Sequence, residues 1–352
     1  MKNIHIAQKA IMRKIKKANA KKKKLHLQKA MHSKRVHKKK NEFKLPYYKS
    51  RRYTLSLPEN FSLLNNTQGT VNAITEILRT SREKDCSSIY IQMEHVKNLD
   101  VSATALLLSV VNSLSKKYIN IFGSIPIDEK VSDFLSDTGF LDHMTDLQGK
   151  HFERKTANPN LMIERGFDKT SNKQVGEAIK KAVKYLTGTE SPYQPVYSIT
   201  QEMCANSIEH ANQYKMNKNW LFTVFYEPDK VIFTMTDVGV GILSTLKKKK
   251  RQEILDSIKQ KTDLDVLYGA FDKKYLSATL DNNRNKGLPK IRETSMNGYV
   301  NNLKVLTNNV LLDFANAPNS RSINSKLNGT FYYWELTKES IDIWKKRKQN
   351  NF

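Results

Sequence analysis

The chain has 352 residues, 39% of them hydrophobic and 9% aromatic, which is enough to bury a core and excludes a wholly disordered protein. The formal charge is +26, and the longest apolar run, residues 103–111, is too short to cross a bilayer, so we expect no membrane span. Two cysteines, Cys86 and Cys204, are too few for a disulfide framework or a four-ligand zinc site, which favours a reducing compartment such as the cytoplasm.

The positive charge is concentrated at the N-terminus. Residues 1–52 hold 20 Lys and Arg against one acid, Glu42, for a net charge of +19, whereas the other 300 residues carry +7. Lysine clusters such as Lys21–Lys24 suit the phosphates of nucleic acid or another polyanion, which bind through counterion release. An anionic membrane surface, or a solvated tail without a partner, is the alternative. We predict a flexible basic arm over residues 1–52.

Residues 53–150 alternate short strands with helices. Alternating apolar and polar residues predict the strands, and apolar residues at three- and four-residue spacing predict the helices. In chain order the expected elements are strand 53–57, helix 71–80, strand 88–93, helix 103–114, strand 118–122 and a helix that begins at residue 131. Strands that alternate with helices imply a small α/β sheet.

The loop Leu99–Ala103 between the second strand and its helix, together with the Asp137–Gly139 turn, resembles a STAS domain, the fold of anti-sigma-factor antagonists. That family carries Asp-Ser-Ser-Gly in the loop, and its second serine accepts a phosphate. The resemblance places Asp100 at the start of the motif and Ser102 at the acceptor, although the residues on either side of Ser102 differ from the family. From its position alone, Ser102 is either a helix N-cap or a regulatory phosphosite.

Residues 165–340 form the second predicted domain. On one of its helices, Glu202, Asn206 and His210 recur every four residues and therefore lie on one face. That face is either a functional stripe or the solvent side of an amphipathic helix. In chain order the expected elements are helix 174–186, helix 197–212, strands 220–226 and 231–236, helix 265–271, a helix opening at 283–288 and strand 331–336.

A glycine-containing loop, Asp237–Gly241, directly follows the second of these strands. A carboxylate at the end of a buried strand can accept a hydrogen bond from an exocyclic amine, and glycines let the backbone approach a planar ring. Taken alone, this composition is also that of a structural turn. Farther along, Gly287 opens a helix whose free N–H groups favour phosphate, and Gly329 and Thr330 lead into the last strand.

In this order, the motifs resemble the GHKL ATPase domain shared by gyrase-like, Hsp90-like, histidine-kinase and anti-sigma-kinase proteins. The resemblance implies a two-layer α/β sandwich, the Bergerat fold, that binds ATP with Mg²⁺. A general base in such a site must take a proton near neutral pH, which a carboxylate can do. The implied roles are Asp237 for the adenine amino group, Gly239 and Gly241 for the shape of its pocket, Asn206 for Mg²⁺, Glu202 as general base, Gly287 for the phosphates and Thr330 for contact with the nucleotide.

Three features of this region leave alternatives open. Asn285 stands where the family has the first glycine of its second glycine box. His210 either reaches a phosphate or packs structurally. Residues 242–286 occupy the position of the ATP lid, and their Lys247–Arg251 run either steers phosphate or nucleic acid or is a solvated charge run.

The sequence thus predicts a basic arm (1–52), a STAS-like domain (53–150), a GHKL ATPase domain (165–340) and a basic C-terminal tail (341–352). A phosphoacceptor helix pair and a transducer domain are not recognised, so we expect neither a sensor histidine kinase nor a complete gyrase-like machine.

The leading functional hypothesis is an ATP-dependent signalling enzyme, either a Ser/Thr protein kinase with a protein substrate or an ATPase switch. The alternative is a nucleic-acid-binding adaptor in a defence or regulatory assembly, whose ATP pocket only controls conformation. A third hypothesis is that the ATPase domain phosphorylates Ser102 within the same chain. Whether ATP is hydrolysed stays open, as does a homodimer, since GHKL relatives often dimerise.

Overall fold

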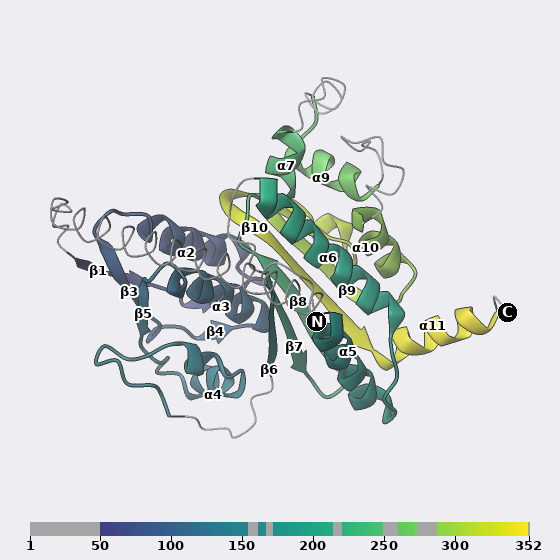
Figure 1. The fold of residues 1–352 in the computed structure, drawn as a ribbon, viewed down its shortest axis with the longest axis horizontal. Coiled ribbons are helices and arrows are strands. Elements are labelled where there is room, and N and C mark those ends of the chain that lie inside the picture. The colour runs from purple at the N-terminus through teal and green to yellow at the C-terminus, as the bar shows by residue number, and fades with distance from the viewer. Residues whose placement is uncertain are drawn as a thin grey trace, which may run out of the picture. The chain divides into compact units, whose positions relative to one another are not determined.

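The computed structural model describes residues 50–153, 161–166, 172–213, 220–248, 260–272 and 287–350 (Figure 1). Several sequence predictions lie outside these residues: the basic arm up to Lys49, most of the Lys247–Arg251 run, Asn285 and the side chain of His210. Within the described part, no helix combines the length and the apolar character needed to cross a membrane.

The N-terminal part of the described chain is built on a parallel three-stranded sheet. Its strands lie in the order β1-β3-β5, and a second, two-stranded parallel sheet pairs β2 with β4. The elements are β1 (Arg51–Ser56), β2 (Asn60–Phe61), α2 (Thr67–Thr80), β3 (Cys86–Gln92), β4 (Asn98–Leu99), α3 (Val101–Ser115), β5 (Asn120–Gly123), α4 (Glu129–Asp137) and the short 3-10 helix η1 (Phe140–His143).

An antiparallel five-stranded sheet follows, with its strands in the order β6-β7-β8-β10-β9. The expected mixed α/β character is therefore confirmed. The elements are β6 (Leu161–Gly166), α5 (Asn172–Thr187), α6 (Gln194–Gln213), β7 (Trp220–Tyr226), β8 (Lys230–Asp237), α7 (Ile242–Lys248), α9 (Asp263–Phe271), α10 (Gly287–Met296), β9 (Asn301–Asp313), η2 (Ala317–Asn319), β10 (Arg321–Thr337) and α11 (Lys338–Asn350).

Both faces of the five-stranded sheet are buried. On one face, Phe222, Phe233 and Trp334 stack on one another in a core completed by α5 and α6. Side chains alternate across a strand, so their neighbours point the other way. Two of those neighbours, Leu221 and Ile232, belong to a second core that includes residues of α2 and α3.

Helix α3 explains how the second core is closed. Helix α2 contacts β10, and α3 contacts β5, β7 and β8, so α3 lies against strands of both sheets. A helix that is apolar on all sides is a buried helix, and 13 of the 15 residues of α3 are buried. Residues 50–352 consequently form one compact unit.

Candidate functional site

Helix α6 presents two of the sequence-predicted residues at the edge of the core. Four of its apolar side chains are fully buried and anchor the helix on the sheet, those of Val196, Ile199, Met203 and Cys204. Glu202 and Asn206, four residues apart, are half-buried on another part of its surface. Packing of the apolar face thus fixes the direction of the polar one.

Glu202 lies against the first turn of α10. A Cβ atom placed on Gly287, the first residue of α10, would lie 2.9 Å from Glu202 Oε2, so the carboxylate packs directly against this glycine. One turn along α10, Lys290 Nζ donates to Glu202 Oε1 over 3.4 Å. Both side chains keep substantial exposure, 44% for Lys290 and 34% for Glu202, so the pair is solvated.

Asn206 holds an unused hydrogen-bonding group. Its Nδ2 atom is buried and has no partner among the described residues. A buried amide that is not satisfied costs free energy, so its retention suits a group reserved for a ligand. Because an amide can flip, this side chain offers the site either a donor or an oxygen ligand.

Asp237 ends β8 and lies between two neighbouring strands. It pairs in register with Thr330 of β10 on one side and with Trp220 of β7 on the other. Ser207, next to Asn206 on α6, donates to Asp237 Oδ2 over 3.3 Å. This contact joins the helix that carries Glu202 and Asn206 to the strand that carries Asp237.

The carboxyl group of Asp237 is poorly solvated. Burial raises its pKa to about 6, although hydrogen bonds from Ser207 and from the hydroxyl and backbone N–H of Thr330 act to lower it. Among the described residues it forms no ion pair. An acceptor held in a desolvated place without a cation is suited to a neutral donor such as an amine.

Two glycines surround this carboxylate closely. A Cβ atom on Gly239 would lie 2.9 Å from Asp237 Oδ1. Gly329 has φ +132°, and a Cβ there would lie 2.0 Å from the carbonyl oxygen of Asp237. The strand-end and the loop can approach each other only because both residues are glycine.

Gly241 serves the loop in another way. It has φ +81°, and its Cβ would lie 2.5 Å from the side-chain oxygen of Asn308 on β9. The space beside this glycine is therefore occupied by a protein side chain. Asn308 and its neighbour Thr307 both hydrogen-bond to the Gly239–Ser244 region.

The structure thus brings the second-domain candidates together through α6, the end of β8, the start of α10 and the middle of β10, which begins at Arg321 and not near Thr330 as the sequence predicted. Motif spacing had identified Glu202, Asn206, Asp237, the three loop and helix glycines and Thr330. It had not identified Ser207, Lys290, Thr307 or Asn308, which are recognised only through their contacts. The one sequence signal that could have indicated Asn308 is that asparagine adopts a positive φ more readily than most other residues.

Ser102 lies apart from this group. The interpretation of Ser102 as a helix N-cap is wrong, because the cap of α3 is Asp100, whose Oδ1 accepts from the backbone N–H of Ala103 over 2.7 Å. Ser102 is only 1% exposed, and its hydroxyl has no partner among the described residues. Its helix packs into the core on the sheet face opposite α6, so the fold keeps this hydroxyl from solvent.

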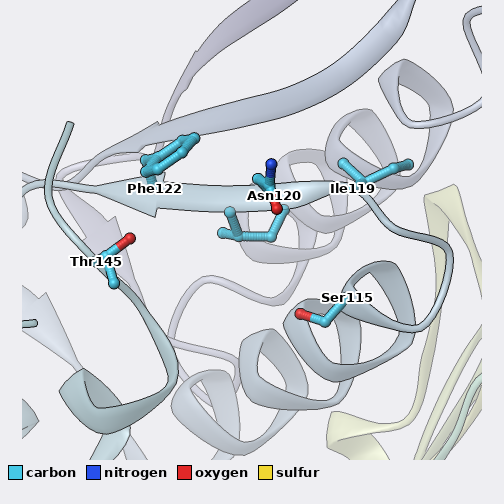
Figure 2. Close-up of a pocket in the computed structure, with 6 residues that line it drawn as sticks. Ser115, Ile119, Asn120, Phe122 and Thr145 are labelled. Carbon is cyan, nitrogen blue, oxygen red and sulfur yellow. The ribbon is translucent and has the colours of Figure 1, made fainter. Parts of the chain in front are cut away.

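A hollow of about 370 Å³ lies in the three-stranded part and contains none of the predicted site residues. Figure 2 shows β5 crossing it, with Ser115 on the adjoining helix and Thr145 on the facing loop. Its lining residues are Ser115, Ile119, Asn120, Ile121, Phe122 and Thr145, none of them titratable near neutral pH.

The chain matches no protein-family model and no curated protein. In the described part of the chain, no group of three His, Cys, Asp or Glu side chains converges as a metal site. The site offers two carboxylates in different surroundings: Asp237 is poorly solvated, and Glu202 is solvated beside Lys290. It also offers the Asn206 Nδ2, which has no partner among the described residues, and a helix that starts at Gly287.

Proposed function

We propose that residues 165–340 are a GHKL-type domain that binds ATP with Mg²⁺ and that the STAS-like segment 53–150 precedes it in a regulatory protein. The observation that carries the proposal is Asp237, a poorly solvated carboxylate at the end of a central strand that accepts from Ser207 and forms no ion pair among the described residues. The ionised group costs folding free energy in that place, and accepting a hydrogen bond from the adenine amino group would compensate the cost.

The neighbours of Asp237 support the same assignment. A nucleotide bound by its base at Asp237 needs donors for its phosphates and room for its ring. Gly287 starts α10, whose free N–H groups suit phosphate, and it lies directly against Glu202. Thr330 reaches Asp237 from the adjacent strand.

Asn206 fits the role of a magnesium ligand. Its Nδ2 is unpartnered among the described residues, and turning the amide over would put in that place an oxygen, which is among the ligands that Mg²⁺ accepts beside phosphate oxygens. When bound, the ion would neutralise charge on the phosphates. Four residues earlier on the same helix, Glu202 could take a proton from water or from an acceptor hydroxyl.

These assignments support an ATP-dependent signalling enzyme, either a Ser/Thr protein kinase or an ATPase switch. In both reactions Glu202 removes a proton from the attacking oxygen. Lys290, whose Nζ lies 3.4 Å from Glu202 Oε1, would orient the carboxylate. Neither role requires Ser102, whose burial disfavours phosphorylation in the folded chain.

The test is calorimetric titration of ATP with Mg²⁺ into the wild-type protein and into Asp237→Asn. Asp229→Asn is the matched control, because Asp229 is exposed in the turn before the same strand and loses the same charge. We expect binding in the wild type and the control, and a loss of affinity of about ten- to one-hundred-fold in Asp237→Asn, the value of a hydrogen bond to a charged group. Absence of wild-type binding, or equal affinity in all three proteins, would reject the proposal.

A second candidate function, the nucleic-acid adaptor, is favoured by charge. In addition to the arm, helix α11 exposes four consecutive cations, Lys345 to Lys348. Association with DNA or RNA through these groups should weaken steeply with salt. Deletion of residues 1–49 should remove this association, and unchanged affinity after the deletion would refute the adaptor function.

A further inference from the structure

Two adjacent residues in the middle of β9, Thr307 and Asn308, hold the loop that follows Asp237. Neither belongs to a motif recognised in the sequence, and both are buried, at 0% and 1% exposure. Each uses its side chain on a segment more than sixty residues away in the chain. Both residues also pair with β10, Thr307 with Thr330 and Asn308 with Leu327, so they connect that strand to the loop after Asp237.

Thr307 connects both halves of the pocket. Its Oγ1 accepts from the backbone N–H of Ile242 over 2.9 Å and donates to the carbonyl of Gly329 over 3.0 Å. One hydroxyl thus ties the start of α7, which continues the Asp237 loop, to the residue that precedes Thr330. Both partners lie next to residues that we assign to nucleotide binding.

The Asn308 side chain forms three hydrogen bonds to the same loop and the start of α7. Its Nδ2 donates to the carbonyl of Val240 over 2.8 Å and to Ser244 Oγ over 3.1 Å, while its Oδ1 accepts from the backbone N–H of Ser244 over 3.1 Å. The residue has φ +53°, a conformation in which asparagine is enriched among non-glycine residues. Its side chain fills the space that a Cβ on Gly241 would take.

These contacts matter because the loop has little stiffness of its own. Gly239 and Gly241 widen the backbone conformations available between Asp237 and α7. The backbone N–H groups of Ile242 and Ser244, at the start of α7, donate to Thr307 and Asn308 and are therefore not available to a ligand. This end of α7 is thus a structural anchor, and phosphate binding is left to the start of α10.

We infer that Thr307 and Asn308 are positioning residues that set the selectivity of the pocket for adenine, an inference that rests on the proposed function. By holding the loop, they keep the Asp237 carboxylate in one position, where it can accept a hydrogen bond from the amino group of adenine. Loosening the loop should therefore weaken discrimination between adenine, which has an amino group there, and hypoxanthine, which has an oxygen.

The experiment uses the full chain with Asn308→Gly and Thr307→Val. Glycine keeps the positive φ and removes only the amide, and valine keeps the shape of threonine and removes only the hydroxyl. Thr307→Ser should restore the hydroxyl and the wild-type behaviour. Thr234→Val is the control, since Thr234 is also buried in this sheet but bonds only to Thr223, over 2.7 Å.

The first measurement is amide hydrogen exchange without nucleotide. We expect the amides of Ile242 in Thr307→Val and of Ser244 in Asn308→Gly to exchange about ten-fold faster than in the wild type, as the loss of one hydrogen bond predicts. Thr307→Ser and Thr234→Val should exchange like the wild type at these amides. Unchanged exchange in both test variants would overturn the inference whether or not ATP binds.

The second measurement is the ratio of affinities for ATP and inosine triphosphate. A purely structural role would lower both affinities together and leave the ratio unchanged, which would overturn the inference. A positioning role lowers the ratio about ten-fold in the two test variants and leaves it intact in Thr307→Ser. If the wild type itself fails to bind or to discriminate, the proposed function fails, and the exchange result still decides whether these residues hold the loop.

Discussion

Replacing Asp237 by asparagine should stabilise the nucleotide-free protein while it weakens ATP binding about ten- to one-hundred-fold. Burial raises the pKa of the Asp237 carboxyl to about 6, and this value already includes the hydrogen bonds from Ser207 and Thr330. An unfolded aspartate has a pKa of about 3.9, so keeping the native carboxylate ionised at pH 7.5 costs about 3 kcal/mol. Asparagine resembles the neutral acid and does not carry this cost.

The contribution of Asp237 to the free energy of unfolding depends on pH, and its sign follows from the direction of the pKa shift. Between pH 4 and 6 the native carboxyl binds more protons than the unfolded one, so this group makes stability fall as pH rises. Above pH 6 the full cost is present, and below pH 4 it disappears. The advantage of Asp237→Asn over the wild type should therefore be about 3 kcal/mol at pH 7.5 and close to zero near pH 4.

The assay is urea unfolding of wild type, Asp237→Asn and the exposed control Asp229→Asn at several pH values, followed by circular dichroism. The control should differ from the wild type by less than about 0.5 kcal/mol, as surface substitutions usually do. If Asp237→Asn is less stable than the wild type at pH 7.5, the carboxylate is not paying a desolvation cost, and the argument that reserves it for a ligand fails. ATP affinity in the wild type should also fall below pH 6, relative to Asp237→Asn, because the protonated acid is a weaker acceptor.

Three further predictions test other parts of the fold and the site. Glu202→Gln should lower ATP turnover about 100-fold or more and leave ATP affinity within about three-fold, as measured by phosphate release and calorimetry; equal loss of both would assign Glu202 to binding. Gly329→Ala should lower the melting temperature sharply, because its Cβ would lie 2.0 Å from the Asp237 carbonyl oxygen, whereas Gly149→Ala, at φ +80° and with nothing within 4 Å of its Cβ, should cost only about 1 kcal/mol. Intact-mass analysis after incubation with ATP should show no phosphate on Ser102, which is 1% exposed, and phosphate there would show that α3 leaves the core.

Strong periodicity made most elements predictable, whereas β9 escaped prediction because of its composition. Residues 301–313 contain four asparagines, which are typical of turns, and two of them, Asn302 and Asn308, have positive φ values of 50° and 53°. These residues are accommodated where the pairing with β10 shifts register. Tertiary contacts, such as those of Asn308 with the Asp237 loop, stabilise a conformation that local preference disfavours.

The end of the chain differed from its prediction for a related reason. The lysine-rich composition of residues 341–352 predicted a tail, yet Lys338–Asn350 form α11. Two side chains attach this helix: Ile341 is 1% exposed, and Trp344 packs edge-on against Tyr193 at 5.1 Å between ring centroids. A basic run can therefore be helical when apolar contacts anchor the first turns of its helix.

The candidate site was predictable where its members are close in sequence and hidden where they are far apart. Glu202 and Asn206 share a helix face and Asp237 precedes its glycines, and the resemblance of these short motifs to the GHKL boxes predicted their roles. Lys290 meets Glu202 across 88 positions of the chain, and Asn308 meets Val240 across 68. Such partners depend on how strands order themselves in the sheet, which periodicity does not determine.

Helices α2 and α3 of the N-terminal part cover the face of the five-stranded sheet opposite α5 and α6, and so connect that part to the strand that carries Thr330. Helix α2 binds the N-terminal part of β10: Gln68 Nε2 donates to Ser325 Oγ over 2.8 Å, its Oε1 accepts from the N–H of Asn324 over 2.7 Å, and Arg321 donates to Thr67 over 2.8 Å. A few residues later the same strand carries Gly329 and Thr330 beside Asp237. Without α2 and α3, apolar residues such as Phe225 would face water, and a sheet face of this kind drives aggregation. We therefore expect residues 165–350 to be insoluble when expressed alone and soluble with residues 50–153, and a soluble, nucleotide-binding fragment would show that the shared core is dispensable.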